Sequence, residues 1–322
     1  MSTELRTILL TTDGSADAAV ASRIAAGISE KTHAALHVVH VCTDLAPVVY
    51  PSWYPPCEFD YYSHPLEEEA RDLLRRQAWK ARSARGRVVR EHLREGDPAE
   101  EIVALAEELD ADLMVIGNRG AGRLRRLVAR SVSESVVHRA SCPVLVVRGG
   151  EKAWPIKRVV VGDDGSRLAR QAGKFATEIA DVFGAEVVLV RAYENPPAPL
   201  GGWSAEERRE LDEARLRDLS TLEGWAEQLG TMAHDRPDTK MIESKPAPAI
   251  VDVAGEAEET QSLIAVGSRG LSAPKRVLLG SVSTKILRTA DGPILVVPSA
   301  QAQRVDRTPP EATHAERTWR NG

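Results

Sequence analysis

The sequence predicts an α/β fold built from two similar open sheets in tandem, each made of parallel strands with helices on both faces. The 322-residue length is that of about two domains. The sequence also contains an internal repeat. The segment "RTILLTTDGS" (6–15) resembles "KRVVVGDDGS" (157–166), and "ADLMVIGNRG" (111–120) resembles "QSLIAVGSRG" (261–270). An offset of about 150 residues indicates a duplicated domain, since solenoid repeats have periods of ~20–50 residues.

Short apolar runs mark the strands of the first half. They are Ile8–Leu10, Leu36–Val41, Leu113–Ile116 and Val144–Val147. Continuous runs of this kind, without polar alternation, are typical of strands that are buried on both faces of a parallel sheet. The last run returns in the second half, where "CPVLVV" becomes "GPILVV".

Apolar stripes predict the helices between these strands. In the first half the stripe has the spacing i, i+3, i+4, i+7 and consists of Ile102, Leu105, Ala106 and Leu109. A comparable stripe in the second half consists of Ala172, Phe175, Ile179 and Phe183. Each stripe gives its helix one apolar face to pack on a sheet. Alternating strands and helices therefore favour an open α/β sheet with helices on both faces.

The repeat predicts a first domain at 1–149 and a second at 150–300, joined by the glycine- and proline-containing stretch 148–156. The polar residues 301–322 are predicted to form a disordered tail. Residues 47–62 carry six aromatic side chains. This segment is either an apolar cluster packed on the first domain or a subunit contact or lid over a site.

Composition argues against several classes of protein. A net charge of −5 and a pI near 6.0 disfavour a nucleic-acid binder, and no run approaches the ~20 apolar residues that cross a membrane. The basic stretch 71–90 is interpreted as a solvated helix face. Three scattered cysteines, Cys42, Cys57 and Cys142, suit neither a disulfide framework nor a zinc site. Reduced thiols, and hence a cytoplasmic location, are expected.

Two glycine-rich stretches follow apolar strands at matching places. "GSRGLSAPKRVLLGS" spans 267–281, "GNRGAGRLRRLVARS" spans 117–131, and each leads into a striped helix. In open α/β sheets, ligands bind beyond the carboxyl ends of the strands. Free N–H groups at a helix start attract phosphate, glycine permits positive φ and close backbone approach, and Ser131 and Ser281 would be good N-caps. The stretches therefore predict a phosphate cradle, although neither is a Walker motif.

The spacing G-x-x-G, nine residues, then G-[ST], near the close of a domain that opens with an apolar strand and Asp13 or Asp164, resembles the universal stress protein family. The resemblance covers about 4–148 and 156–298, and the duplication is similar to the family's tandem members. It implies two open, five-stranded parallel-sheet sandwiches of the Rossmann-like, nucleotide-binding kind.

The resemblance also places the closing strands, 144–147 and 294–297, at sheet edges. Unpaired edge strands tend to pair, so we expect these two to pair with each other and make an intramolecular pseudo-dimer. We expect two like domains rather than one continuous sheet. A homodimer of the whole chain stays open.

Carried over by position, the resemblance implies an adenine nucleotide, ATP with or without Mg²⁺, at the strand ends of each half. In the second half Asp164 would lie at the ribose or the magnesium ion, and the backbone of Ala192 at the adenine. The phosphates and ribose would be held by Gly267, Gly270, Gly280, Ser281, Val282 and Ser283. The matching residues of the first half are Asp13, Val41, Gly117, Gly120, Arg130, Ser131, Val132 and Ser133.

Arg130 stands where the second half has Gly280. Its side chain takes space that the backbone needs to approach phosphate, and at positive φ a non-glycine residue costs ~1 kcal/mol. A guanidinium can instead pair with phosphate, and Arg123, Arg125 and Arg126 lie in the same stretch. The departure predicts unequal sites. The first is either weakened, which we favour, or retained through Arg130.

The favoured function is that of a nucleotide-binding regulatory protein of a stress response, which binds ATP and is not an enzyme. A slow ATP hydrolase and a nucleotide-free assembly module are the alternatives. The sequence offers no base, Walker lysine or arginine finger for phosphoryl transfer, and the complete stretch 267–281 argues against the module. Asp163 and Asp164 could form a metal pair, but neighbouring residues at a strand end point in opposite directions. One of the two is therefore expected to be structural.

Overall fold

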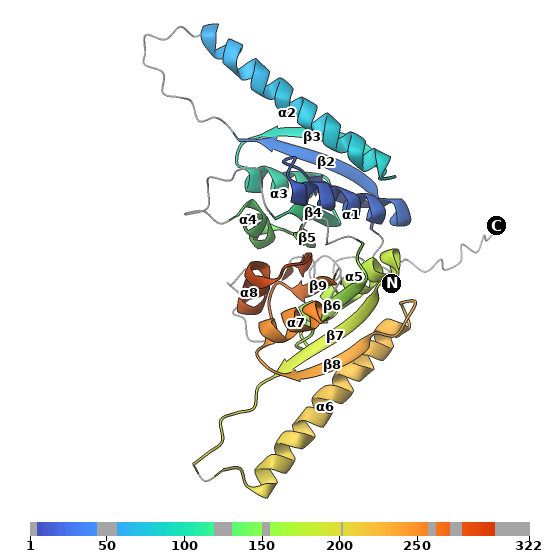
Figure 1. Ribbon diagram of the computed structural model, residues 1–322, viewed down its shortest axis with the longest axis vertical. Coiled ribbons are helices and arrows are strands. Elements are labelled where there is room, and N and C mark those ends of the chain that lie inside the picture. The colour runs from blue at the N-terminus through green and yellow to red at the C-terminus, as the bar shows by residue number, and fades with distance from the viewer. Residues whose placement is uncertain are drawn as a thin grey trace, which may run out of the picture.

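The computed structural model describes residues 5–43, 57–118, 131–149, 155–200, 202–256, 262–270 and 279–299, with only the backbone at 57–66. Two α/β halves lie end to end (Figure 1). The first half contains β1 (Thr7–Thr11), α1 (Ala16–Thr32), β2 (Ala35–Cys42), α2 (Cys57–Ser83), β3 (Val88–Glu95), α3 (Pro98–Glu108), β4 (Leu113–Gly117), α4 (Val132–Arg139) and β5 (Val144–Val147). The second contains β6 (Arg158–Gly162), α5 (Arg167–Phe183), β7 (Glu186–Tyr193), α6 (Ala205–Gly230), β8 (Asp238–Glu243), α7 (Pro246–Gly255), β9 (Ser262–Gly267), α8 (Ser281–Thr289) and β10 (Ile294–Val297).

The strands form one ten-stranded sheet in the order β3-β2-β1-β4-β5-β10-β9-β6-β7-β8. Within each half the five strands are parallel, as predicted. The closing strands β5 and β10 pair antiparallel, with Leu145 opposite Leu295. The expectation of two domains without a continuous sheet is thereby corrected. The reason is that β5 and β10 are apolar edges whose unpaired N–H and C=O groups find partners in each other.

Two apolar clusters cover the two faces of this sheet. The helices α1, α2, α5 and α6 pack on one face, with Ile24 and Ile179 among the fully buried side chains. The helices α3, α4, α7 and α8 pack on the other face, through residues that include Ile102 and Ile250. The faces continue across the β5–β10 junction, so helices of both halves share each cluster. The N-terminal ends of the long helices α2 and α6 extend beyond the sheet (Figure 1).

The sequence prediction missed the outermost strands, β3 and β8. Their residues are half-exposed and mostly polar, because each lies at an end of the sheet with a neighbour on one side only. The basic stretch 71–90, predicted to be a helix face, contains the last part of α2 and also the start of β3. Residues 47–56 of the aromatic segment and the tail 301–322 lie outside the described residues. None of the described helices is long and apolar enough to cross a membrane.

A histidine pair links β2 to β3. His37 Nδ1 and His92 Nε2 lie 2.9 Å apart, and the rings stack with their centroids 5.2 Å apart. Burial, followed by the charge of His37, lowers the pKa of His92 to about 4. Burial and the nearby Arg90 lower the pKa of His37 as well. The folded protein therefore holds this pair neutral, with one ring donating to the other.

Stability should fall as the pH is lowered from 7 to 4. Unfolded histidine takes up a proton near 6.5 and folded His92 only near 4, so the unfolded chain binds more protons across this window and is favoured as pH falls. We expect His92→Gln to flatten this dependence of the urea midpoint, and His234→Gln, at an exposed histidine, to leave it unchanged. An equally steep slope in His92→Gln would contradict the assignment.

Candidate functional site

A cavity of about 100 Å³ lies at the carboxyl ends of β6, β7 and β9. It brings together six of the residues predicted for the second half: Asp164, Ala192, Gly267, Gly270, Val282 and Ser283. The remaining wall is formed by Gly162, Asp163, Ala169, Val190, Pro246, Ile250, Val266 and Arg269. Gly280 and Ser281 are not among the lining residues and lie at the start of α8.

The missing side chain of Gly270 makes room for a carboxylate. A Cβ on Gly270 would lie 2.5 Å from Asp164 Oδ2, a distance at which one group must move. The other oxygen, Oδ1, accepts a hydrogen bond of 2.9 Å from the backbone N–H of Ser166. Asp164 is thus fixed in the turn between β6 and α5 and faces the loop that follows β9.

The glycines of the cradle are not required for positive φ. Gly117, Gly267, Gly270 and Gly280 all lie outside the left-handed region, and Gly280 has φ −74°. A Cβ on Gly280 would lie 3.4 Å from Ser268 O, which is an ordinary contact. Positive φ, the condition for backbone strain at this position, is not met at Gly280, whose conformation any L-residue can adopt. A Cβ at 280 would lie in van der Waals contact with the 268–270 backbone, at 3.4 to 3.9 Å from Ser268 O, Arg269 Cα and Gly270 N.

Gly117 and Gly267 have a packing role at the ends of β4 and β9. A Cβ on Gly267 would lie 2.8 Å from the Cβ of Leu168 and 3.0 Å from its carbonyl carbon. A Cβ on Gly117 would lie 2.8 Å from the backbone nitrogen of Ala18. Glycine at both places lets the strand end meet the first turn of α5 or α1, as in other α/β units.

The two phosphate-cradle helices begin differently. Ser131 is the N-cap of α4, and its Oγ accepts a bond of 3.2 Å from Glu134 N. In the second half Gly280 takes the N-cap position and no side chain caps α8, so the prediction of Ser281 as N-cap is wrong. Helix α8 begins one residue earlier than predicted, at Ser281, and the N–H of Gly280 donates a hydrogen bond of 2.6 Å to Ser268 O. The first N–H groups of α8 consequently have no side-chain cap and suit an anion.

Asp163 and Asp164 do separate into two roles. Asp163 is buried and accepts bonds from Nε and Nη2 of Arg191, the first at 3.1 Å. Arg191 also donates from Nη1 to the backbone oxygen of Asp218, at 3.0 Å, which ties β7 to α6. At the matching places of the first half, His40 Nδ1 lies 2.8 Å from the backbone oxygen of Thr12. The second half therefore has a buried ion pair where the first has a contact between a histidine ring and a backbone oxygen.

The first half repeats part of the site. Asp13 follows β1, and its Oδ1 accepts from Ser15 N at 2.9 Å, as Asp164 does from Ser166. Val41 lies near the end of β2, and Val132 and Ser133 lie in the first turn of α4. Gly120 and Arg130 lie outside the described residues. No group of three or more His, Cys, Asp or Glu side chains that could hold a metal ion is found in the described part of the chain.

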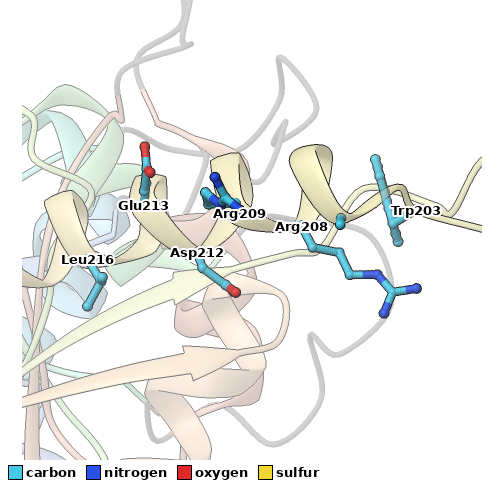
Figure 2. A pocket seen from close by; sticks show the side chains of 7 residues that line it. Trp203, Arg208, Arg209, Asp212, Glu213 and Leu216 are labelled. Carbon is cyan, nitrogen blue, oxygen red and sulfur yellow. The ribbon is translucent and has the colours of Figure 1, made fainter.

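A larger hollow, of about 720 Å³, is not a candidate site. Its lining is Trp203, Ala205, Arg208, Arg209, Asp212, Glu213 and Leu216. All of these belong to α6 or directly precede it, so no second element closes the space. Figure 2 shows Arg209 and Glu213 on one side of the helix and Arg208 and Asp212 on the other. Charges of both signs that diverge from one exposed helix do not converge on a ligand.

Comparison with known proteins agrees with this architecture. A sequence model of the Universal stress protein family matches residues 4–148 and 155–298. A universal stress protein of Mycolicibacterium smegmatis is 31% identical over 301 residues, which cover 90% of this chain and 96% of the relative. The chain belongs to the universal stress protein family.

Other members of the universal stress protein family span the same length. One from Mycobacterium tuberculosis is 29% identical and covers 90% of this chain and 96% of its own. The crystal structure of a universal stress protein from Archaeoglobus fulgidus is similar in fold, with a TM-score of 0.62 at 22% identity. It covers 92% of this chain and 97% of its own.

Part of the lining escaped the sequence prediction. Arg269 lies between two predicted glycines, so the motif itself could have indicated it. Pro246 and Ile250 belong to α7, and no motif distinguishes them from ordinary core residues. Their place in the wall follows only from the packing of α7 beside β6 and β7.

Removing Arg191 should destabilise the protein strongly. Arg191→Ala leaves the buried carboxylate of Asp163 unpaired, at a cost of ~3–5 kcal/mol in the free energy of unfolding. The double change Asp163→Thr with Arg191→His, which copies the first half, should recover most of this loss. Arg158→Ala breaks a more exposed pair with Glu186 and should cost at most ~1 kcal/mol. Urea unfolding measures all three, and equal losses for Arg191→Ala and Arg158→Ala would disprove the role of the buried pair.

Proposed function

We propose that this universal stress protein binds ATP, chiefly in its second half, and acts as a nucleotide-dependent regulatory protein rather than as an enzyme. The observation that carries the proposal is the start of α8. It combines a helix N-terminus without a side-chain cap, a glycine at 280 that lies close to the 268–270 backbone, and the carboxylate of Asp164 held opposite Gly270. These residues fit a nucleotide, since N–H groups suit phosphate and a carboxylate suits ribose hydroxyls or a magnesium ion.

The roles of the residues follow from where they lie. Backbone N–H groups of Ser281, Val282 and Ser283 would bind phosphate oxygens, with the positive end of the α8 dipole. Asp164 would accept from the ribose or bind magnesium, with the phosphates supplying further oxygen ligands. The backbone at Ala192, where β7 ends, would meet the base. Magnesium would come with the nucleotide, because a single carboxylate is a weak site alone.

The size of the cavity implies movement on binding. At about 100 Å³ it is smaller than the ~300–1,000 Å³ of usual small-molecule sites. The wall on one side is formed by Pro246 and Ile250 of α7, and on another by Arg269, whose guanidinium donates to Ser299 Oγ. A nucleotide would separate these walls, and that displacement is a signal that a partner protein could read.

The pairing of β5 with β10 supports a second part of the proposal. We propose that the two halves work as an intramolecular pseudo-dimer, with one nucleotide-binding half held against the other. The first half would bind more weakly, since the Oγ of Ser131 already caps α4. A homodimer would then use surfaces other than these closing edges, which are buried.

Gly280→Val should abolish ATP binding by the second half, because its branched side chain would crowd the 268–270 backbone, which a Cβ at 280 already meets at 3.4 to 3.9 Å. Gly224→Val is the matched control, since a Cβ at Gly224 meets no atom within 4 Å. Native mass spectrometry and chromatography of bound nucleotide distinguish the outcomes. Intact bound ATP supports the proposal, ADP formed with turnover supports a slow hydrolase, and no bound nucleotide supports an assembly module. Unchanged affinity in Gly280→Val would show that the cradle is wrongly placed.

Arg130→Gly should tighten the weaker site or create one. Loss of two N–H contacts to a phosphate, at ~1.5–3 kcal/mol each, would weaken the first site by tenfold or more in the native protein. Titration calorimetry with ATP on the native protein and on Arg130→Gly measures the difference. Two equal sites in the native protein, one of them weakened by Arg130→Gly, would instead make Arg130 a phosphate ligand.

A further inference from the structure

Arg148, at the end of β5 in the first half, holds the helix α8 of the second half. Its Nη1 donates to the backbone oxygen of Ala290 at 2.7 Å, and its Nη2 donates to that of Leu287. These carbonyls belong to the C-terminal end of α8, where a helix leaves its last oxygens without partners inside the helix. A guanidinium there satisfies two of them and lies at the negative end of the helix dipole.

The same guanidinium reaches back to the first-half loop. Arg148 Nη2 donates to Asn118 Oδ1 at 3.0 Å, and Ser133 Oγ donates to the same oxygen at 3.2 Å. Ser133 Oγ lies 3.0 Å from Ser131 Oγ, and because the proton of Ser133 is used on Asn118, Ser131 is the donor. A continuous chain of hydrogen bonds thus runs from the start of α4 through Asn118 to the end of α8.

A second contact runs beside this chain. Arg288, in the last turn of α8, pairs with Glu134, in the first turn of α4, at 3.2 Å. The pair is largely exposed on the arginine side and contributes little by itself. The second half cannot hold α4 in the same way, because the residue that matches Arg148 is Pro298, which has no charged group.

We infer that Arg148 is a positioning residue through which the first half sets the affinity of the second candidate nucleotide site, so that the two sites are coupled. The inference rests on the proposed function. Helix α8 has nine residues, and its Arg148-bound end lies ~9–13 Å from the residues at its start, at 1.5 Å per residue. A short rigid helix held at its C-terminal end presents its N–H groups at a defined place. Changes at Ser133 or Asn118 reach that end through Arg148.

The first experiment needs no ligand. Arg148→Gln removes the positive charge and one of the two nitrogens that donate to α8. We therefore expect amide hydrogen exchange within Lys285–Thr289 to accelerate at least fivefold. Arg139→Gln is the matched control, since Arg139 lies on α4 and pairs only with the exposed Glu100 among the described contacts. Equal exchange in both variants would show that Arg148 does not hold α8, and would overturn the inference whatever the protein binds.

The second experiment measures coupling by calorimetric titration of the full chain with ATP. We expect Arg148→Gln to weaken binding by the second half three- to tenfold, Arg148→Lys to recover at least half of the loss, and Arg139→Gln to have no effect. Asn118→Ala, which keeps the bonds of Arg148 to α8 but breaks the link to Ser133, should change second-half affinity by more than twofold.

The outcomes separate the two proposals. The Arg148→Gln and Asn118→Ala variants could melt at a lower temperature and still bind ATP with an affinity within twofold of the native protein. That result would show a structural role only and overturn the coupling. A native protein that binds no ATP overturns the proposed function and, with it, the coupling. The hydrogen-exchange result on α8 would then still show whether Arg148 anchors this helix.

Discussion

The antiparallel pairing of β5 with β10 is the contact on which the remaining architecture depends. Both strands are short and fully buried, and each would otherwise be an apolar edge with unpaired backbone groups. Their pairing turns two five-stranded sheets into one, and it lets helices of both halves share an apolar cluster on each face. It also brings the first half close enough to α8 for Arg148 to join Asn118 to the end of α8 and for Arg288 to pair with Glu134 of α4. Duplication alone would give two domains, whereas this pairing gives one structural unit.

The halves have diverged at the places where ligands bind in open α/β sheets. The second half has a buried ion pair, Asp163 with Arg191, and a helix that starts at glycine without a side-chain cap. The first half has a contact between the ring of His40 and the backbone oxygen of Thr12, and its helix is capped by its own Ser131. A serine that already accepts an N–H competes with an incoming phosphate. The asymmetry is thus present in the described hydrogen bonds, independently of the residue at 130.

Much of the fold could be predicted because the information is local. Apolar runs such as Leu113–Ile116 and apolar stripes such as the α5 face depend only on residue spacing. The duplicated motifs can be found by comparing the two halves of the sequence. Six of the residues predicted for the second half line one cavity, since the glycines that follow β9 and the aspartate that follows β6 meet at the same edge of the sheet. The edge strands β3 and β8 were missed because half-exposed strands carry charges and lose the apolar signal.

Residue spacing along the chain is enough to predict the duplication, the parallel strands of each half and the strand ends at which the candidate site lies. Tertiary packing sets three further features: the joining of the two sheets into one, the start of α8 after Gly280 with no side-chain cap, and the room that Gly270 leaves for Asp164. The link from Asn118 through Arg148 to α8 belongs to this second group. Arg148 lies 139 and 142 positions before the two α8 carbonyls that it binds, and such contacts are set by packing, which local patterns do not encode.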